Sequence, residues 1–198
     1  QPSTTSPLHD SAVQALLIGA STGGPTAIQH LLESMSADVS FPVFIAQHMP
    51  RAFTSIFAQR LNMMLDWTVK EATDGEKPQA RTVYICPGNL HMEIEHARIH
   101  LTKPGTTDRY IPSVDRLFAS AATAYGERAV AVVLTGMGKD GAEGGRKISE
   151  RGGLLIAEAR ETCVVYGMPK ALIETGCPVE EIPLDRIAGR VSDMRSSS

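Results

Sequence analysis

Three residues that could together carry out acyl transfer occur at separate points of this chain, each just beyond a short apolar run. The first is Ser21, within the sequence Gly-Ala-Ser-Thr-Gly at residues 19–23. Glycines on both sides of a serine allow a sharp turn between a strand and a helix, which exposes the hydroxyl beside the free N–H groups of the helix. The pattern therefore favours a serine nucleophile. The competing interpretation is an ordinary tight turn in which Ser21 or Thr22 caps the helix.

The second and third residues are a histidine and an aspartate. His48 ends a predicted strand and precedes Met49-Pro50, and Asp140 lies in a glycine-rich stretch after the most apolar predicted strand. A serine hydroxyl needs a neighbouring base, and a neutral imidazole is the usual base near pH 7. A carboxylate orients that imidazole and stabilises its protonated form. We expect Ser21, His48 and Asp140 to form such a triad, although Asp140 could instead cap a helix.

The stretch around Asp140 also supports a different interpretation. Residues Gly136, Gly138 and Gly141 form a G-x-G-x-x-G pattern, and Glu158 follows at the end of the next predicted strand. This is the arrangement of a dinucleotide site, in which the acidic residue binds the ribose. A dinucleotide-binding oxidoreductase therefore stays open as an alternative. Against it, Asp140 would place a carboxylate near the pyrophosphate, and the pattern comes late in the chain.

Weaker candidates lie elsewhere. Three histidines and two glutamates gather in or near a predicted hairpin, but their spacing matches no strong metal motif, and we expect a solvated hairpin face. Cys163 could be a nucleophile, but its sequence context predicts a short buried strand. The hairpin residues are His91, Glu93, Glu95, His96 and His100.

Hydrophobic periodicity predicts the elements that must position these residues. Strands are expected at residues 15–18, 41–46, 82–86, 129–134 and 154–157, and helices at 25–35, 52–65, 113–125, 141–151 and 169–174. A hairpin is expected at 92–95 and 98–101. This alternation predicts an α/β fold, with a doubly wound, mostly parallel sheet, helices on both faces and a small antiparallel hairpin. Ligands bind such sheets beyond the carboxyl ends of the strands, where the candidate triad falls.

Composition sets further limits. The chain has 198 residues, 42% of them hydrophobic, and a net charge of −3, which argues against a nucleic-acid binder. No apolar run approaches the length of a membrane span. Three cysteines without a C-x-x-C pattern fit reduced thiols in the cytoplasm. From composition we expect residues 1–11 to be a solvated linker end, 12–194 one domain and 195–198 a disordered tail.

Five segments in order resemble the catalytic domain of the bacterial chemotaxis protein-glutamate methylesterase family, CheB. They are residues 18–24 (Ile-Gly-Ala-Ser-Thr-Gly-Gly), 47–50 (Gln-His-Met-Pro), 112–115 (Pro-Ser-Val-Asp), 134–141 (Leu-Thr-Gly-Met-Gly-Lys-Asp-Gly) and 163–169 (Cys-Val-Val-Tyr-Gly-Met-Pro). The resemblance implies hydrolysis of glutamate γ-methyl esters on chemoreceptors and deamidation of receptor glutamines. It also implies that 12–194 is the methylesterase catalytic domain and that 1–11 is the remnant of a linker.

The resemblance also implies roles for individual residues. Ser21 would be the nucleophile, His48 the base and Asp140 the carboxylate. The oxyanion would be bound near two pairs of neighbours, Thr22 with Gly23 and Met137 with Gly138. Neither a metal nor a cofactor is expected.

Partners follow from the same resemblance. We expect the methylated cytoplasmic helices of chemoreceptors as substrate and an N-terminal receiver domain in the full-length protein. The cysteines, the net charge and the short apolar runs described above separately predict a cytoplasmic location and no binding of nucleic acid or insertion into membrane. The hairpin at 92–101 and the loop at 103–111 are candidate substrate surfaces. A receptor-binding module without catalytic activity stays open as a second alternative.

Overall fold

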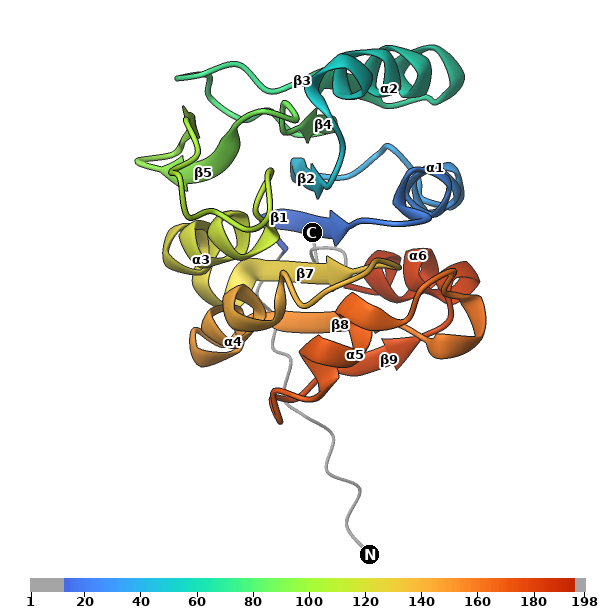
Figure 1. Ribbon diagram of the computed structural model, residues 1–198. Coiled ribbons are helices and arrows are strands. Elements are labelled where there is room, and N and C mark those ends of the chain that lie inside the picture. The colour runs from blue at the N-terminus through green and yellow to red at the C-terminus, as the bar shows by residue number, and fades with distance from the viewer. Residues whose placement is uncertain (1–12, 195–198) are drawn as a thin grey trace, which may run out of the picture.

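The computed structural model describes residues 13–194. Within that range the strands form a seven-stranded sheet in the order β3-β4-β2-β1-β7-β8-β9 and a separate two-stranded sheet, β5-β6. Every pairing in the large sheet is parallel and the hairpin is antiparallel, which confirms the predicted α/β fold (Figure 1). The predicted linker at 1–11 and tail at 195–198 lie outside the described residues.

The strands and helices alternate along the chain. The strands of the large sheet are β1 (Ala15–Ala20), β2 (Val43–Gln47), β3 (Thr68–Glu71), β4 (Thr82–Ile85), β7 (Ala129–Val133), β8 (Leu154–Glu158) and β9 (Glu180–Ile182). The hairpin strands are β5 (His91–Glu95) and β6 (Arg98–Thr102). The helices are α1 (Gly24–Ser34), α2 (Arg51–Met64), α3 (Val114–Tyr125), α4 (Ala142–Glu150), α5 (Gly167–Ile173) and α6 (Leu184–Ser192).

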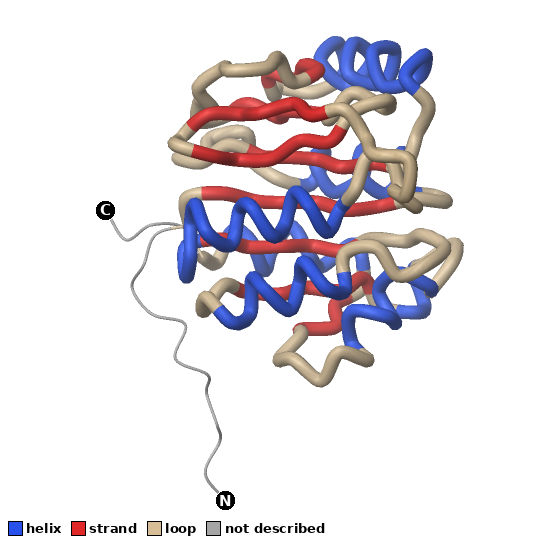
Figure 2. Tube along the Cα trace, turned by 60° about the vertical axis from the view of Figure 1, so that its left-hand side comes forward, coloured by secondary structure: helices blue, strands red, loops and turns tan. Residues whose placement is uncertain are grey.

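Helices cover both faces of the large sheet. The apolar side chains of α1, α2 and α6 pack against one face, and those of α3, α4, α5 and the hairpin pack against the other. Figure 2 looks toward the second layer, whose helices cross in front of the sheet. Since both faces are covered, the central strands are apolar throughout, and every residue of β1, β2 and β7 is buried.

The direction of chain winding reverses beside β1. The chain builds outward from β1 through β2 on one side, and later returns to pair β7 on the other side of β1. In the register, Ile18 of β1 lies opposite Ile45 of β2 and Val132 of β7. This reversal is a topological switch point, where the loops on the two sides separate and leave a crevice at the carboxyl ends of the strands.

Some elements differ from the expectation. The edge strands β3 and β9 were not predicted, because they are short and only partly buried. The helix α6 was not predicted either. The predicted strand at Cys163 is wrong, because Val164 is exposed and the backbone there pairs with the Thr135 hydroxyl and with Gly136. Across residues 13–194, every helix is too short or too polar to cross a bilayer.

Candidate active site

Ser21, His48 and Asp140 follow β1, β2 and β7, which are neighbours at the centre of the sheet. The pairing of the strands continues into the site, because the His48 N–H donates to the Ala20 carbonyl (3.0 Å) and the Ser21 N–H to the Thr135 carbonyl (3.0 Å). The structure therefore places all three predicted residues at the carboxyl edge of the sheet beside the switch point.

Ser21 lies in a strand-turn-helix segment, as predicted. Gly23 is the N-cap of α1 and has a φ of 81°, in the left-handed region that favours glycine. No side chain caps α1, so the interpretation of Ser21 or Thr22 as a helix cap is wrong. The loop after β7 passes close to the serine, since a Cβ added to Gly136 would lie 2.8 Å from the Ser21 Cβ. Glycine at this position allows that close approach.

His48 and Asp140 form a hydrogen-bonded pair, with 2.7 Å between His48 Nε2 and Asp140 Oδ2. The histidine side chain is 14% exposed and the aspartate is fully buried. Because a carboxylate only accepts hydrogen bonds, this contact assigns the proton to Nε2 and leaves the lone pair on Nδ1. The imidazole is thus prepared to accept a proton at Nδ1.

Asp140 is held by the first amides of α3. Its Oδ2 also accepts from the Val114 N–H (2.7 Å), and its Oδ1 accepts from the Asp115 N–H (2.8 Å). These amides open α3, whose own N-cap is Ser113, as predicted. The idea that Asp140 caps the helix following it is wrong, because Gly141 is the N-cap of α4 and Asp140 binds the free amides of α3 instead.

Asp115, at the start of α3, in turn binds backbone amides at the start of α4. Its Oδ1 accepts from the N–H groups of Gly141 (2.9 Å) and Gly144 (2.7 Å), in the first turn of α4. Burial raises the pKa of the Asp115 carboxyl, the charge of Asp140 raises it further, and the hydrogen bond from Gly144 opposes both. The two aspartates thereby fix α3 and α4 to each other. Sequence reasoning placed Asp115 in the first helical turn without finding this role.

Gln47, the last residue of β2, joins the serine and histidine segments. Its buried Nε2 donates to the carbonyls of Ser21 (2.9 Å) and His48 (3.1 Å). This residue was missed from the sequence, although an amide at the end of an apolar strand is a usable signal. It holds the backbone at Ser21 and the backbone at His48 at a fixed separation.

The residues expected to bind an oxyanion lie on two sides of Ser21. Thr22 and Gly23 follow it in the chain, while Met137 and Gly138 follow the close-packed Gly136. Within residues 13–194 the amide N–H groups of Thr22 and Met137 have no protein acceptor. Both amides can therefore donate to a developing oxyanion.

The dinucleotide alternative fails at the residue that would bind the ribose. Glu158 is fully buried at the end of β8, and its Oε2 accepts from the Thr135 N–H at 2.7 Å. Burial raises the pKa of this carboxyl. A buried side chain already bonded to the backbone is not available to a ribose hydroxyl, and Asp140 in the same turn faces His48.

Cys163 is also unsuited to nucleophilic chemistry. Burial, followed by the charge of Glu158, raises the pKa of its thiol to about 12, whereas reactive cysteines have a lowered pKa. The three cysteines of the chain are free thiols. No group of three or more potential metal ligands is found among the described residues.

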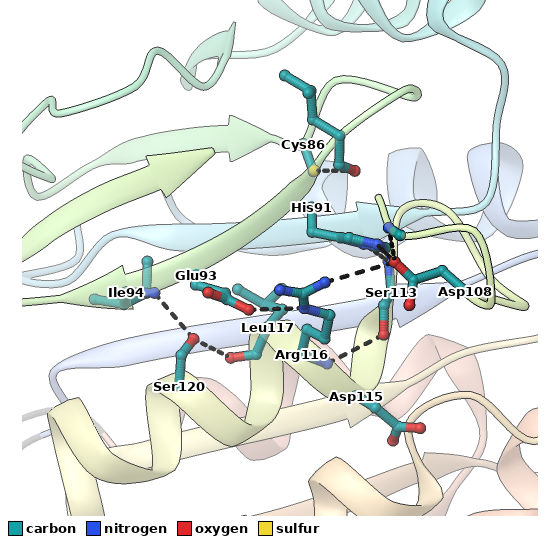
Figure 3. A network of polar contacts seen from close by, with 12 residues as sticks. Cys86, His91, Glu93, Ile94, Asp108, Ser113, Asp115, Arg116, Leu117 and Ser120 are labelled. Carbon is teal, nitrogen blue, oxygen red and sulfur yellow. Dashed lines mark hydrogen bonds and ion pairs between the residues drawn. The ribbon is translucent and has the colours of Figure 1, made fainter. Parts of the chain in front are cut away.

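The sequence predicted that the hairpin histidines lie on one solvated face, and for His91 this prediction is wrong. His91 is fully buried and takes part in a polar network with Asp108, Ser113 and Arg116, which Figure 3 shows between β5 and α3. Only His96 and His100 keep part of their surface in solvent. The expectation failed for His91 because α3 and the preceding loop cover the start of β5.

The fold is that of a known protein family. The fold and the position of the site define a doubly wound α/β protein with its polar residues at the switch point. The family model described as CheB methylesterase matches residues 16–191. The chain therefore belongs to the CheB methylesterase family.

Two relatives and one solved structure illustrate the similarity. A protein-glutamate methylesterase/protein-glutamine glutaminase of Clostridium acetobutylicum is 45% identical over 188 residues, which cover 94% of this chain and 54% of the relative. A Geobacter sulfurreducens protein of the same description is 43% identical over 192 residues, covering 95% and 52%. The chain thus spans about half the length of these curated relatives. The crystal structure of the Thermotoga maritima CheB methylesterase catalytic domain superposes with a TM-score of 0.86 at 37% identity, covering 93% of this chain and all of that one.

Proposed function

We propose that this chain hydrolyses γ-glutamyl methyl esters on chemoreceptors, and deamidates receptor glutamines, through Ser21, His48 and Asp140. The observation that carries the proposal is the buried His48–Asp140 pair, 2.7 Å apart, at the end of the strand adjacent to the one that ends at Ser21. Membership of the CheB methylesterase family supplies the reaction class, since the relatives named above are described by both activities.

The first half of the reaction forms an acyl-enzyme. The Ser21 hydroxyl attacks the ester carbonyl carbon while Nδ1 of His48 takes its proton, and Asp140 stabilises the resulting imidazolium through Nε2. The amides of Thr22 and Met137 bind the oxyanion of the tetrahedral intermediate. The intermediate collapses, the bond to the methoxy group breaks, and His48 donates the proton with which methanol leaves.

The second half regenerates the enzyme. His48 takes a proton from water as the water oxygen attacks the acyl carbon, and the proton passes to Ser21 as the bond to the serine oxygen breaks. The products are a receptor glutamate and methanol. With a glutamine side chain the leaving group is ammonia and the other steps are unchanged, so a single site serves both reactions.

The biological setting is part of the proposal. The substrate is the methylated cytoplasmic helices of a chemoreceptor, and three free thiols agree with a cytoplasmic location. The relatives are about twice as long as this chain, in agreement with a further domain. We assign that domain to an N-terminal receiver that regulates access to the site.

The test is methanol release from a carboxymethylated chemoreceptor cytoplasmic fragment, comparing the parent with Ser21→Ala. We expect release by the parent and a loss of at least about a thousandfold in the variant, as for other serine triads. Labelling by a fluorophosphonate, which requires an activated serine, gives a readout independent of the receptor. A folded parent that is neither labelled nor active would overturn the proposal in favour of a binding module without catalytic activity.

A further inference from the structure

Tyr110 stacks on the imidazole of His48. The two rings are nearly parallel, with an interplanar angle of 4° and 5.1 Å between centroids, which is an offset stack. The hydrogen bond to Asp140 fixes the position of Nε2 and does not by itself set the plane of the histidine ring. A flat aromatic surface against one face of the ring sets that plane. Asp140 and Tyr110 together therefore determine where Nδ1 points.

The hydroxyl of the same tyrosine contacts the turn between Gly136 and Asp140. The Lys139 N–H lies 3.4 Å from Tyr110 Oη, which is a long hydrogen bond. A Cβ added to Gly138 would lie only 2.6 Å from this hydroxyl, and Gly138 has a φ of 97°. The glycine thus leaves the space that the tyrosine fills. One side chain touches both the base and the turn that carries Asp140.

The loop that presents Tyr110 is anchored on both sides. His91 is fully buried, and its Nε2–H donates to Asp108 (2.9 Å), two residues before the tyrosine. Its Nδ1 accepts from the N–H of Ser113 (3.0 Å), three residues after it (Figure 3). The hydrogen bond from His91, and then that from the Gly105 N–H (2.7 Å), lower the pKa of Asp108. A short loop held on both sides presents its middle residue with little freedom.

Helix α3 extends this anchoring to the triad. The Ser113 hydroxyl accepts from the Arg116 N–H (3.2 Å), and Arg116 reaches Glu93 of β5 (2.7 Å) and Asp108 (3.6 Å). The next two amides of the helix, those of Val114 and Asp115, hold Asp140. The hairpin, the loop and the helix N-terminus therefore behave as one rigid support for Asp140 and Tyr110.

We propose that Tyr110 is a positioning residue for His48, holding the imidazole in the plane in which Nδ1 faces Ser21, and that the His91–Asp108 contact supports it by fixing its loop. This inference rests on the proposed role of His48 as the base. A misplacement of about 1 Å at a reacting group can cost about a hundredfold in rate. We therefore expect Tyr110→Ala to lower kcat by about ten- to a hundredfold.

The conservative variant and the kinetic constants separate positioning from other roles. Tyr110→Phe keeps the ring and loses only the 3.4 Å hydrogen bond, so we expect kcat to stay within about threefold of the parent. The KM for the methylated receptor fragment should be nearly unchanged in both variants. Tyr125→Ala, which removes a half-buried tyrosine at the far end of α3, is the matched control for a general loss of packing.

A second readout does not depend on turnover. In ¹H–¹⁵N spectra of the imidazoles, His48 of the parent and of Tyr110→Phe should show a single tautomer protonated at Nε2. In Tyr110→Ala we expect a broadened signal or a mixture of tautomers. Since the spectrum needs no substrate, the orientation of His48 can still be measured if the parent is neither labelled nor active, the result that would overturn the proposed function.

Three results would overturn the inference. One is a Tyr110→Ala enzyme with the kcat and the His48 spectrum of the parent. Another is a variant in which KM rises while fluorophosphonate labelling of Ser21 keeps its rate, since that would make Tyr110 a substrate contact. The third is an equal loss of activity in Tyr125→Ala, which would indicate a general effect on stability.

Discussion

Replacing Asp140 by asparagine removes one negative charge and exchanges one oxygen for an NH₂ group. The carboxylate accepts three hydrogen bonds, from His48 and Val114 at Oδ2 and from Asp115 at Oδ1. An asparagine can satisfy only one side of this arrangement. With its NH₂ at the Oδ1 position, two donors face each other at Asp115. With its NH₂ at the Oδ2 position, His48 has to move its proton to Nδ1, where the base needs a lone pair.

The expected loss of kcat in Asp140→Asn follows from the positive charge that develops on His48 during the reaction. The imidazolium of His48 would lie against the carboxylate with charge centres about 4 Å apart, and both side chains are largely or fully buried. At an effective dielectric constant of about 20 that attraction is about 4 kcal/mol. Because each factor of ten in rate corresponds to about 1.4 kcal/mol, losing it lowers kcat by about a thousandfold. The unmatched amide also costs about 1–3 kcal/mol of folding free energy.

The measurement is the kcat for methanol release from a carboxymethylated receptor fragment, at a temperature well below the melting points of parent and variant. Asp185→Asn makes the same chemical change at an exposed position on α6 and should leave kcat unchanged. If a folded Asp140→Asn enzyme kept kcat within about threefold of the parent, Asp140 would not be the orienting carboxylate, and the electrostatic argument would be refuted.

Two further predictions concern residues near the site. Gly138→Ala should lower kcat by about tenfold or more, because an alanine is strained at a φ of 97° and its Cβ would meet the Tyr110 hydroxyl at 2.6 Å. Tyr110→Phe in the same chain removes the clash with the hydroxyl and leaves the backbone strain, so it should restore part of the loss; a kcat of Gly138→Ala equal to that of the parent would contradict the proposed contact. Glu158→Gln should make the protein more stable than the parent at pH 8. Burial raises the pKa of Glu158 in the folded protein. The contribution of its protonated form to the free energy of unfolding is therefore complete below the ordinary pKa and is lost as pH rises through the raised folded-state pKa, at up to about 1.4 kcal/mol per pH unit. Urea unfolding across pH 4–8 should show the difference in stability between Glu158→Gln and the parent growing with pH, and a constant difference would contradict the raised pKa.

Much of the architecture was predictable because its signals are local. Buried strands and amphipathic helices have distinct periodicities, and the positions of Ser21, His48 and Asp140 at strand ends followed from them. The N-cap at Ser113 was equally local, because the cap and its amide lie three residues apart. The edge strands β3 and β9 escaped prediction since partial burial removes the apolar run that marks a central strand.

The supporting residues of the site were not predictable for a different reason. Gln47, Asp115, Tyr110 and His91 act through contacts between segments that only the folded chain brings together. Each has a bland local context, such as a strand end, a helix turn, a polar loop or a hairpin. His91 in particular looked solvent-facing, because the sequence does not reveal that α3 covers it.

The pairing of β1 with β7 determines when Ser21, His48 and Asp140 come together during synthesis. Residues 15–19 pair with residues 129–133, so a long stretch of chain must close into a loop before the two strands meet. Closing such a loop costs entropy that is recovered only when the pairing forms, which makes this step slow compared with the formation of the helices. During synthesis the serine and the histidine emerge early, and the aspartate arrives only with the segment after β7. A partly made chain therefore carries the proposed nucleophile and base without the proposed carboxylate, and the three residues come together only when the second half of the sheet joins the first.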